Sequence, residues 1–375
     1  MPIRPGAAIR AAAPALAAYL LLRAFGLAVL ALFAHRFERD LWELLGRFDG
    51  TWYVRIAEHG YDRAIPIAPD GGYATTDLAF FPLYPGLIAL LDPVLPGGPR
   101  AAALAISWLA GLAAAWGLFA VGAHLRGRRT GVLLVVLWAV LPHAVVQSMA
   151  YTESLFTALA AWSLYALLRG GWLTAGTLCL VAGLVRPTAA ALVLAVGLAA
   201  LAAVWRRRDG WRPWVAGLLA PLGLLGYLGW VAQRLGRLDG YLHVQGAAWG
   251  MRFDGGRDTY HNIRAILTTP THPLTRYVVT AVLVVAVGLF VLAALDRLPW
   301  PLLVYTGAVL VMALGTAGYY HSRARLLIPA FALLLPPAAG LAAARTRTVV
   351  VVVGLLAVAS AWYGAYLCLL WRYSP

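Results

Sequence analysis

The chain has 375 residues, of which 62% are hydrophobic and 12% charged, with a mean hydropathy of +0.77. Because soluble globular proteins carry about 25% charged residues, this composition excludes a cytosolic enzyme, a coiled coil, a disordered chain and a secreted disulfide scaffold. The net charge of +15 comes from arginine alone, since the chain contains no lysine. Most arginines lie in short loops between apolar runs, so membrane topology explains them better than a nucleic-acid partner does.

Apolar runs predict eleven membrane-spanning helices in one domain, residues 1–375, because a span needs about 20 apolar residues. The first, Pro14–Ala34, follows Arg4 and Arg10 and is too long for a secretory signal. The others are expected at Ala101–Leu125, Gly131–Gln147, Glu153–Leu168, Trp172–Val185, Thr188–Trp205, Pro213–Val231, Tyr277–Leu295, Trp300–Ala317, Leu326–Ala343 and Val349–Leu370. Cys179 and Cys368 fall within these runs and predict neither a disulfide nor a metal site.

Whether the apolar segment Leu78–Pro96 crosses the membrane decides on which side every later loop lies. Four prolines and Asp92 leave about a dozen usable residues, which fits an interfacial or re-entrant helix better than a span. If the segment does not cross, the short cytoplasmic loops hold 13 arginines against 2 acidic residues, as the positive-inside rule requires. The N-terminus is then inside, and residues 35–100 and 233–276 form two long loops outside.

Polar and aromatic residues gather on that outer side. They are Asp49, Trp52 and His59 in the first long loop; Tyr151 and Glu153 where the third span emerges; Arg186 at an outer turn; Gln245 and Trp249 in the second long loop; and His321, Arg323 and Arg325 after the ninth span.

Each of these residues also has a structural interpretation. Asp49 is a favoured helix N-cap residue, Glu153 suits the first turn of a helix, and Arg186 can reach the lipid headgroups. Arg323 and Arg325 can anchor at the interface, as can the loop aromatics, and a loop histidine such as His59 is more often structural than catalytic.

Taken together, the residues favour a functional site. Ionisable groups near a membrane are costly and usually functional. A carboxylate can activate a nucleophile while guanidinium groups hold an anionic lipid phosphate. The sequence contains no DxD, HExxH, GxSxG or P-loop pattern, so nucleotide-sugar, zinc and serine-hydrolase chemistry have no support.

Four stretches resemble the PIG-V-type mannosyltransferases of the GT-C superfamily, polytopic glycosyltransferases that use lipid-phosphate sugars. They are Phe48–Tyr61, Phe80–Pro85, Tyr151–Leu155 and Ala182–Pro187. Two weaker matches are Tyr241–Gln245 with Trp249, and Arg325–Phe331. Phe48 replaces the family's usual Trp, and Leu326 replaces an aromatic residue.

The resemblance implies a GT-C-type fold and an inverting transfer of a hexose, mannose in that family, from a polyprenyl-phosphate donor to an acceptor hydroxyl. Its residue roles are a base at Asp49, a second acid at Glu153, donor-phosphate contacts at Arg186, Arg323 and Arg325, and substrate contacts at Trp52, His59, Tyr151, Gln245, Trp249 and His321. It implies no metal, although some relatives use a divalent cation. The site would face outward from the inner membrane, and the acceptor, a glycolipid, glycan or protein, stays open. The alternative is a lipid-linked-sugar flippase or transporter.

Overall fold

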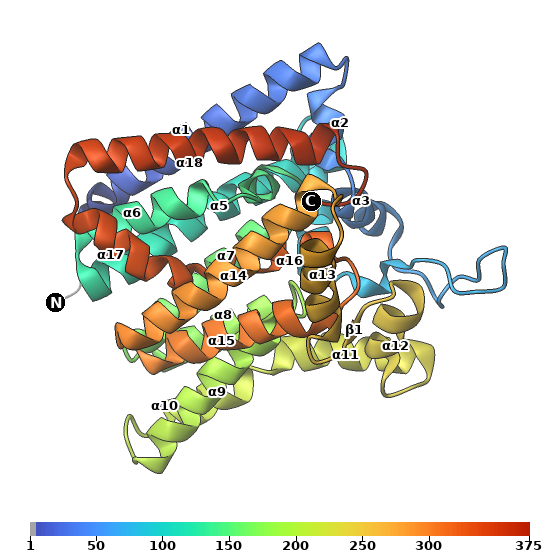
Figure 1. The fold of residues 1–375 in the computed structure, drawn as a ribbon. Helices are drawn as coiled ribbons and strands as arrows, with labels where there is room; N and C mark the ends of the chain where they lie inside the picture. The colour runs from blue at the N-terminus through green and yellow to red at the C-terminus, as the bar shows by residue number, and fades with distance from the viewer. Residues whose placement is uncertain (1–4) are drawn as a thin grey trace.

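The computed structural model describes residues 5–375 (Figure 1); Arg4, used above to orient the chain, lies outside them. The described chain is mostly helical. Its α-helices are α1 (Pro5–Arg36), α2 (Leu41–Gly46), α3 (Asp49–His59), α4 (Leu83–Leu91), α5 (Gly98–Arg126), α6 (Arg128–Ala139), α7 (Glu153–Leu168), α8 (Trp172–Gly183), α9 (Ala189–Trp205), α10 (Arg212–Leu219), α11 (Leu222–Leu235), α12 (Gly240–His243), α13 (Arg257–Thr268), α14 (Leu274–Leu295), α15 (Trp300–Gly315), α16 (Arg323–Leu326), α17 (Leu335–Ala343) and α18 (Thr346–Leu369).

Short 3-10 or π turns and one small strand pair join these helices. The turns are η1 (Asp77–Ala79), η2 (Asp92–Val94), η3 (Ala144–Ser148), η4 (Val244–Ala248, a π turn), η5 (Tyr320–Ser322) and η6 (Phe331–Leu334). Strands β1 (Arg252–Phe253) and β2 (Thr316–Ala317) pair antiparallel, with Arg252 opposite Ala317. This pair attaches the second long loop to the end of α15.

The described helices match the expected spans in position but not always in length. Five are long and apolar enough to cross a membrane singly: Ile9–Arg36, Gly98–Arg126, Arg212–Leu235, Leu274–Leu295 and Thr346–Leu369. A sixth expected span is broken, with a bend of 73° between Tyr320–Leu326 and Phe331–Ala343. Four more are apolar helices of only 10–17 residues, and the helix expected at Gly131–Gln147 ends at Ala139. The number eleven therefore stays a prediction.

The segment Leu78–Pro96 forms α4 followed directly by η2. Residues 83–94 make a helix about 18 Å long at 1.5 Å per residue, which is short of the roughly 30 Å hydrocarbon core. The helix packs on α3 and α5. Because α6 and α8 are equally short, at 12 residues each, the non-crossing path of this segment stays a prediction.

The long helices lie side by side, and the short helices α2, α3, α12 and α13 gather at one end of them, opposite the N-terminus (Figure 1). α5 packs against α6 and α7, and α1 packs against α18 and α6. α8 and α11 approach each other closely at Gly223 of α11. A Cβ on Gly223 would lie 1.9 Å from the carbonyl oxygen of Leu180 in α8, so only glycine fits there. The first long loop contains α2 and α3 and the second contains α12 and α13, so both long loops lie at the same end of the bundle.

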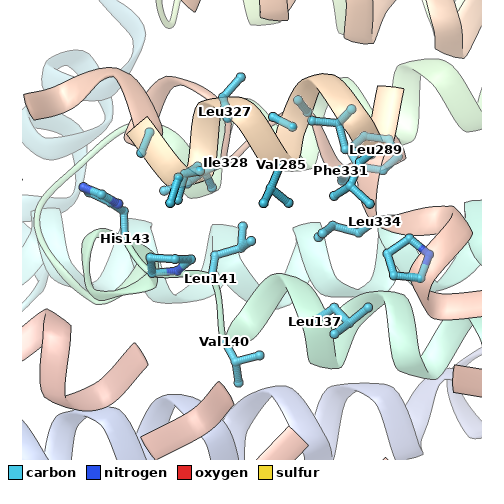
Figure 2. Close-up of a pocket in the computed structure, with 18 of the residues that line it drawn as sticks. Leu137, Val140, Leu141, His143, Val285, Leu289, Leu327, Ile328, Phe331 and Leu334 are labelled. Atoms are coloured by element: carbon cyan, nitrogen blue, oxygen red, sulfur yellow. The ribbon is translucent and has the colours of Figure 1, made fainter. Parts of the chain in front are cut away.

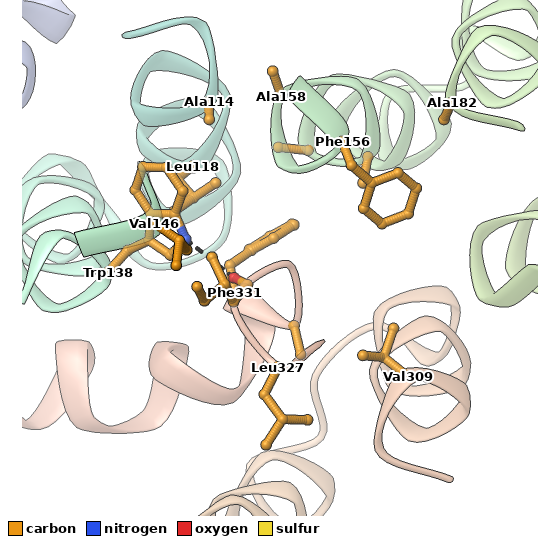
Figure 3. Close-up of a cluster of buried hydrophobic side chains, with 14 of the residues drawn as sticks. Ala114, Leu118, Trp138, Val146, Phe156, Ala158, Ala182, Val309, Leu327 and Phe331 are labelled. Carbon is orange, nitrogen blue, oxygen red and sulfur yellow. Dashed lines mark hydrogen bonds between the residues drawn. The ribbon is translucent and has the colours of Figure 1, made fainter. Parts of the chain in front are cut away.

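The core includes the break between α16 and α17 (Figure 3). The buried indole of Trp138 donates a hydrogen bond to the carbonyl of Ile328, at 3.1 Å. Because buried carbonyls at a helix break need a partner, this bond stabilises the broken segment. The break holds Arg323 and Arg325 at the end of the bundle instead of inside a continuous helix.

Candidate active site

Asp49 is the first residue of α3, and its carboxylate points into the protein. The N-cap of α3 is Phe48, with φ +59° and no side-chain capping bond, so Asp49 does not cap the helix. Positive φ is costly for a bulky residue, by about 1–3 kcal/mol, and such strain clusters at functional sites. Asp49 Oδ2 instead accepts a hydrogen bond from Arg325 Nη1 at 2.9 Å.

Glu153, the first residue of α7, is 1% exposed. Its Oε1 lies 2.9 Å from Arg186 Nη1 and 3.3 Å from Arg325 Nε. Arg186 is itself buried, so its guanidinium does not extend to lipid headgroups. Asp49, Arg325, Glu153 and Arg186 thus form one continuous chain of ion pairs, which we call the charged quartet.

The quartet balances two carboxylates against two guanidinium groups in a partly desolvated place. Burial is the main influence on Asp49 and raises the pKa of its carboxyl, while Arg325 acts in the opposite direction. Removing one partner of a buried pair leaves an uncompensated charge, which is costly. Binding of an anion beside the quartet, or a change in the protonation of Asp49, would therefore change the net charge at the quartet.

A small cavity of about 180 Å³ opens beside the quartet. Asp49, Arg186, Arg323 and Arg325 all line it, from three separate segments of the chain. Its aromatic and polar wall includes Tyr53, Phe80, Thr152, Tyr241, Gln245, Trp249, Tyr319 and Ser374. Two of the three arginines expected to hold a phosphate, Arg186 and Arg325, belong to the quartet.

Arg323 differs from the other two arginines. Its guanidinium binds the carboxylate of Asp258, at 2.5 Å, and the hydroxyl of Thr259, both in α13. Tyr320 lies against the same guanidinium, 4.8 Å away. Arg323 is 1% exposed. It therefore ties the second long loop to the bundle, and its Nη1 and Nη2 already donate to Thr259 and Asp258.

Trp52, Gln245 and Trp249 lie together near the mouth of the cavity. Trp52 stacks on Phe80 with ring centroids 5.7 Å apart and meets Trp249 edge-on at 5.5 Å. Trp249 Nε1 donates to the carbonyl of Thr76 at 3.0 Å. Gln245 Nε2 donates to the Tyr241 hydroxyl at 2.8 Å. These contacts join the two long loops, so the aromatics pack against each other and do not form a belt at the membrane surface.

The other expected substrate residues are spread more widely. The Tyr151 ring lies 5.0 Å below the guanidinium of Arg325, inside the site. His321 packs on Trp371 and Tyr373 and does not line the cavity. The side chain of His59 is 72% exposed at the end of α3 and lies near only Glu58. The structure thus places His59 outside the site, because Glu58 and His59 at the end of α3 are exposed, whereas Ile56 in the same turn packs into the core.

Sequence reasoning missed several residues of the site. Asp258 and Thr259 belong to no recognised sequence motif. Their one signal in the sequence was indirect: a buried Arg323 needs an acidic partner, and the second long loop contains acids. Ser374, five residues beyond α18, lines the cavity and carried no signal in the sequence. Tyr53, whose hydroxyl lies 3.3 Å from that of Thr152, falls inside a recognised motif but was not singled out.

An apolar pocket of about 440 Å³ lies on the other face of α16 (Figure 2). α6, α14, α16, α17 and α18 contribute to it, and His143 is its one ionisable lining residue. Ala324 and Leu327 face this pocket, whereas Arg323 and Arg325 face the polar cavity. Val285 of α14 lines the pocket and is also 58% exposed on the outside of the bundle. The pocket is thus a groove beside the charged quartet.

Within residues 5–375, no three His, Cys, Asp or Glu side chains converge as a metal site would require. Both acids of the quartet already bind arginine. A divalent cation at Asp49 or Glu153 would therefore compete with Arg325 for the carboxylate, and the expected absence of a metal stays a prediction.

Comparison with known proteins gives a match in structure but none in sequence. No protein-family model and no curated protein matches the sequence. The fold matches the crystal structure of ArnT from Cupriavidus metallidurans bound to undecaprenyl phosphate, with a TM-score of 0.54 and 14% identity. The match covers 85% of this chain and 59% of ArnT, so the chain spans about three fifths of that protein's length.

This match and the apolar helices confirm the expected fold class: the described chain is a mostly helical, multi-pass membrane protein whose fold is similar to that of ArnT. At this level of identity the likeness is one of fold. The narrower resemblance to PIG-V-type mannosyltransferases stays a prediction.

Proposed function

We propose that the protein is a GT-C glycosyltransferase that moves a hexose, mannose by the motif resemblance, from a polyprenyl-phosphate donor to an acceptor hydroxyl outside the cytoplasm. The observation that carries the proposal is the charged quartet beside the cavity. It places a carboxylate, Asp49, next to Arg325 and Arg186. Base and phosphate-binding groups are the two components that such a transfer needs.

In the proposed reaction the acceptor oxygen attacks C1 of the hexose from the face opposite the phosphate. The bond between C1 and the phosphate oxygen breaks, and polyprenyl phosphate leaves with its electron pair. Asp49 takes the proton of the acceptor hydroxyl, and Glu153 holds Arg186 and Arg325 in place. Asp49 can act only when it is ionised, and its ion pair with Arg325 favours that form.

Arg325 has a second role in this scheme. Its Nη1 binds Asp49 in the present structure, and a donor phosphate in the cavity would compete for the same guanidinium. Guanidinium binds phosphate and carboxylate by the same charge-assisted hydrogen bonds. Donor binding would therefore weaken the hold of Arg325 on Asp49 and strengthen the base when it is needed.

The groove of Figure 2 is the proposed place for the polyprenyl chain. It is apolar, it opens on the side of the bundle at Val285, and it runs beside α16, which carries Arg325. ArnT, the structural neighbour, was crystallised with undecaprenyl phosphate. A lipid whose chain lay here would have its phosphate close to the quartet.

The test is turnover by the purified protein in nanodiscs, with undecaprenyl-phosphate mannose and a mixture of envelope glycolipids. We expect release of undecaprenyl phosphate together with a mannosylated product, and activity that persists in EDTA. Undecaprenyl-phosphate glucose in a parallel reaction tests the choice of sugar. Movement of the intact donor between leaflets without bond cleavage would refute the proposal and favour the flippase.

A further inference from the structure

The chain beyond α18 turns back over the candidate site. Residues 370–375, which we call the closing segment, are attached at two points. The backbone N–H of Trp371 donates to the carbonyl of Tyr366 at 3.0 Å. The rings of Trp371 and Tyr373 pack on His321, with centroids 5.4 and 5.3 Å away. These contacts bring Ser374 to the wall of the polar cavity.

Ser374 contacts the site through both its hydroxyl and its backbone. The hydroxyl accepts a hydrogen bond from Arg325 Nη1 at 2.9 Å and pairs with the Tyr151 hydroxyl at 3.0 Å. Its carbonyl accepts a hydrogen bond from the Ser322 hydroxyl at 3.5 Å. Tyr151 also supports the guanidinium of Arg325 from below. Ser374 therefore belongs to the surroundings of Arg325, although it is distant from that residue in sequence.

The hydrogen bonds of Arg325 fix the plane of its guanidinium. Nη1 carries two hydrogens; Asp49 accepts one and Ser374 the other. Nε faces Glu153. Removing the Ser374 hydroxyl would leave one Nη1 hydrogen without its partner. The planar guanidinium could then rotate about the Cδ–Nε bond of Arg325. Because a small misplacement of a charged group can cost a large factor in rate, this orientation matters for the reaction.

We propose that Ser374 is a positioning residue of the active site: its hydroxyl holds Arg325 in the orientation that faces Asp49 and the donor phosphate. The inference rests on the proposed function for its effect on turnover. It predicts that the closing segment is part of the active site and more than a cover over the bundle. Simple packing of the segment would require its rings and backbone but not the Ser374 hydroxyl.

The experiment compares Ser374→Ala and Ser374→Thr with the matched control Ser163→Ala. Ser163, in α7, is also buried; its hydroxyl donates to the carbonyl of Ala175 at 2.8 Å, and it lines neither the polar cavity nor the apolar groove. We expect Ser374→Ala to lower kcat by about tenfold or more. Ser374→Thr, which keeps the hydroxyl, should restore most of it, and Ser163→Ala should leave kcat unchanged.

A second readout does not depend on turnover. Infrared spectroscopy follows protonation of the Asp49 carboxyl, identified by the band that Asp49→Asn removes. Arg325 lowers the pKa of Asp49, so a loosely held Arg325 should let that pKa rise. We therefore expect the midpoint to move to higher pH in Ser374→Ala and to return in Ser374→Thr.

The two readouts separate the possible failures. An unmoved midpoint together with wild-type kcat in Ser374→Ala would overturn the positioning role. A wild-type protein that cleaves no donor would overturn the proposed function, while a moved midpoint would still establish that Ser374 holds Arg325.

Discussion

Arg325 is the residue on which the site depends, because it binds Asp49, Glu153 and Ser374 at once. A shared guanidinium of this kind couples the acids to each other. Changes at any one of the three partners should therefore be non-additive with changes at Arg325, as is usual for residues of one ion-pair network.

Asp49→Asn tests the base. Removing a general base typically costs about 10²–10⁴-fold in rate, so transfer should fall by at least the lower factor. Donor affinity should not fall, because the donor phosphate no longer competes with a carboxylate for Arg325. Since Asp49 does not cap α3, folding should be little affected. Initial rates with saturating donor, and thermal unfolding as the control, measure both effects; near-normal turnover would move the role of base to Glu153.

The pH profile gives an independent check on Asp49. The base acts only when ionised, so the rate should fall as pH drops through its pKa. Burial raises that pKa, and the acid limb should therefore lie above the ordinary aspartate range. A series of rates from pH 4 to 8 should show this limb in the wild-type protein. A limb at the ordinary position would contradict the assignment.

Arg186→Gln tests whether Arg186 binds the donor phosphate. Losing one charge-assisted hydrogen bond to the phosphate should cost about 1.5–3 kcal/mol, which appears as a donor KM raised by tenfold or more. Arg237→Gln is the matched control, because Arg237 pairs only with Asp239 on the exposed surface. Equal donor KM values for the two variants would show that Arg186 serves Glu153 alone.

At the scale of the element, α16 separates the two chemical environments of the site. Its arginines face the polar cavity, while Ala324 faces the apolar groove with Leu327 just beyond the helix. A continuous helix would carry residues three and four apart on one face. α16 keeps this spacing, because Arg323 and Leu326 line the polar cavity while Ala324 and Leu327 line the apolar groove, so adjacent residues serve opposite sides.

The groove is tested by Val285→Trp in α14. The larger ring should fill part of the apolar pocket and raise the donor KM several-fold for an undecaprenyl chain, but not for a donor with a two-isoprene chain. Val284→Trp is the matched control, since Val284 is as exposed as Val285, 59% against 58%, yet does not line the pocket. If both variants behave alike with both donors, the polyprenyl chain lies elsewhere.

For the whole molecule, the orientation in the membrane follows from the arginine bias of the short loops. A reporter fused after Arg208 should be cytoplasmic, and one fused near Gly256 should be outside, because positively charged short loops remain inside. Gly256 directly precedes α13, which binds Arg323 of the site. The reversed pair of results would place the entire candidate site on the cytoplasmic side.

The sequence alone determined the membrane class and most helix positions, and it predicted the main members of the candidate site. Composition excludes water-soluble folds, and apolar runs are strong local signals because every backbone group in a bilayer needs a helical partner. Asp49, Glu153, Arg186 and Arg325 were recognisable because charge next to apolar runs is costly and therefore conspicuous.

Only the tertiary structure decided how these charges pair. The Asp49–Arg325 contact joins residues 276 positions apart, and no periodicity encodes such a contact. Arg323 looks the same as Arg325 in sequence, yet the bend after α16 and the position of α13 turn it toward Asp258. His59 shares a motif with Asp49 but ends on the exposed face of α3. Ser374 enters the site only because aromatic packing on His321 folds the chain back. Local patterns specify which residues are costly to bury, whereas long-range packing specifies which partners they meet.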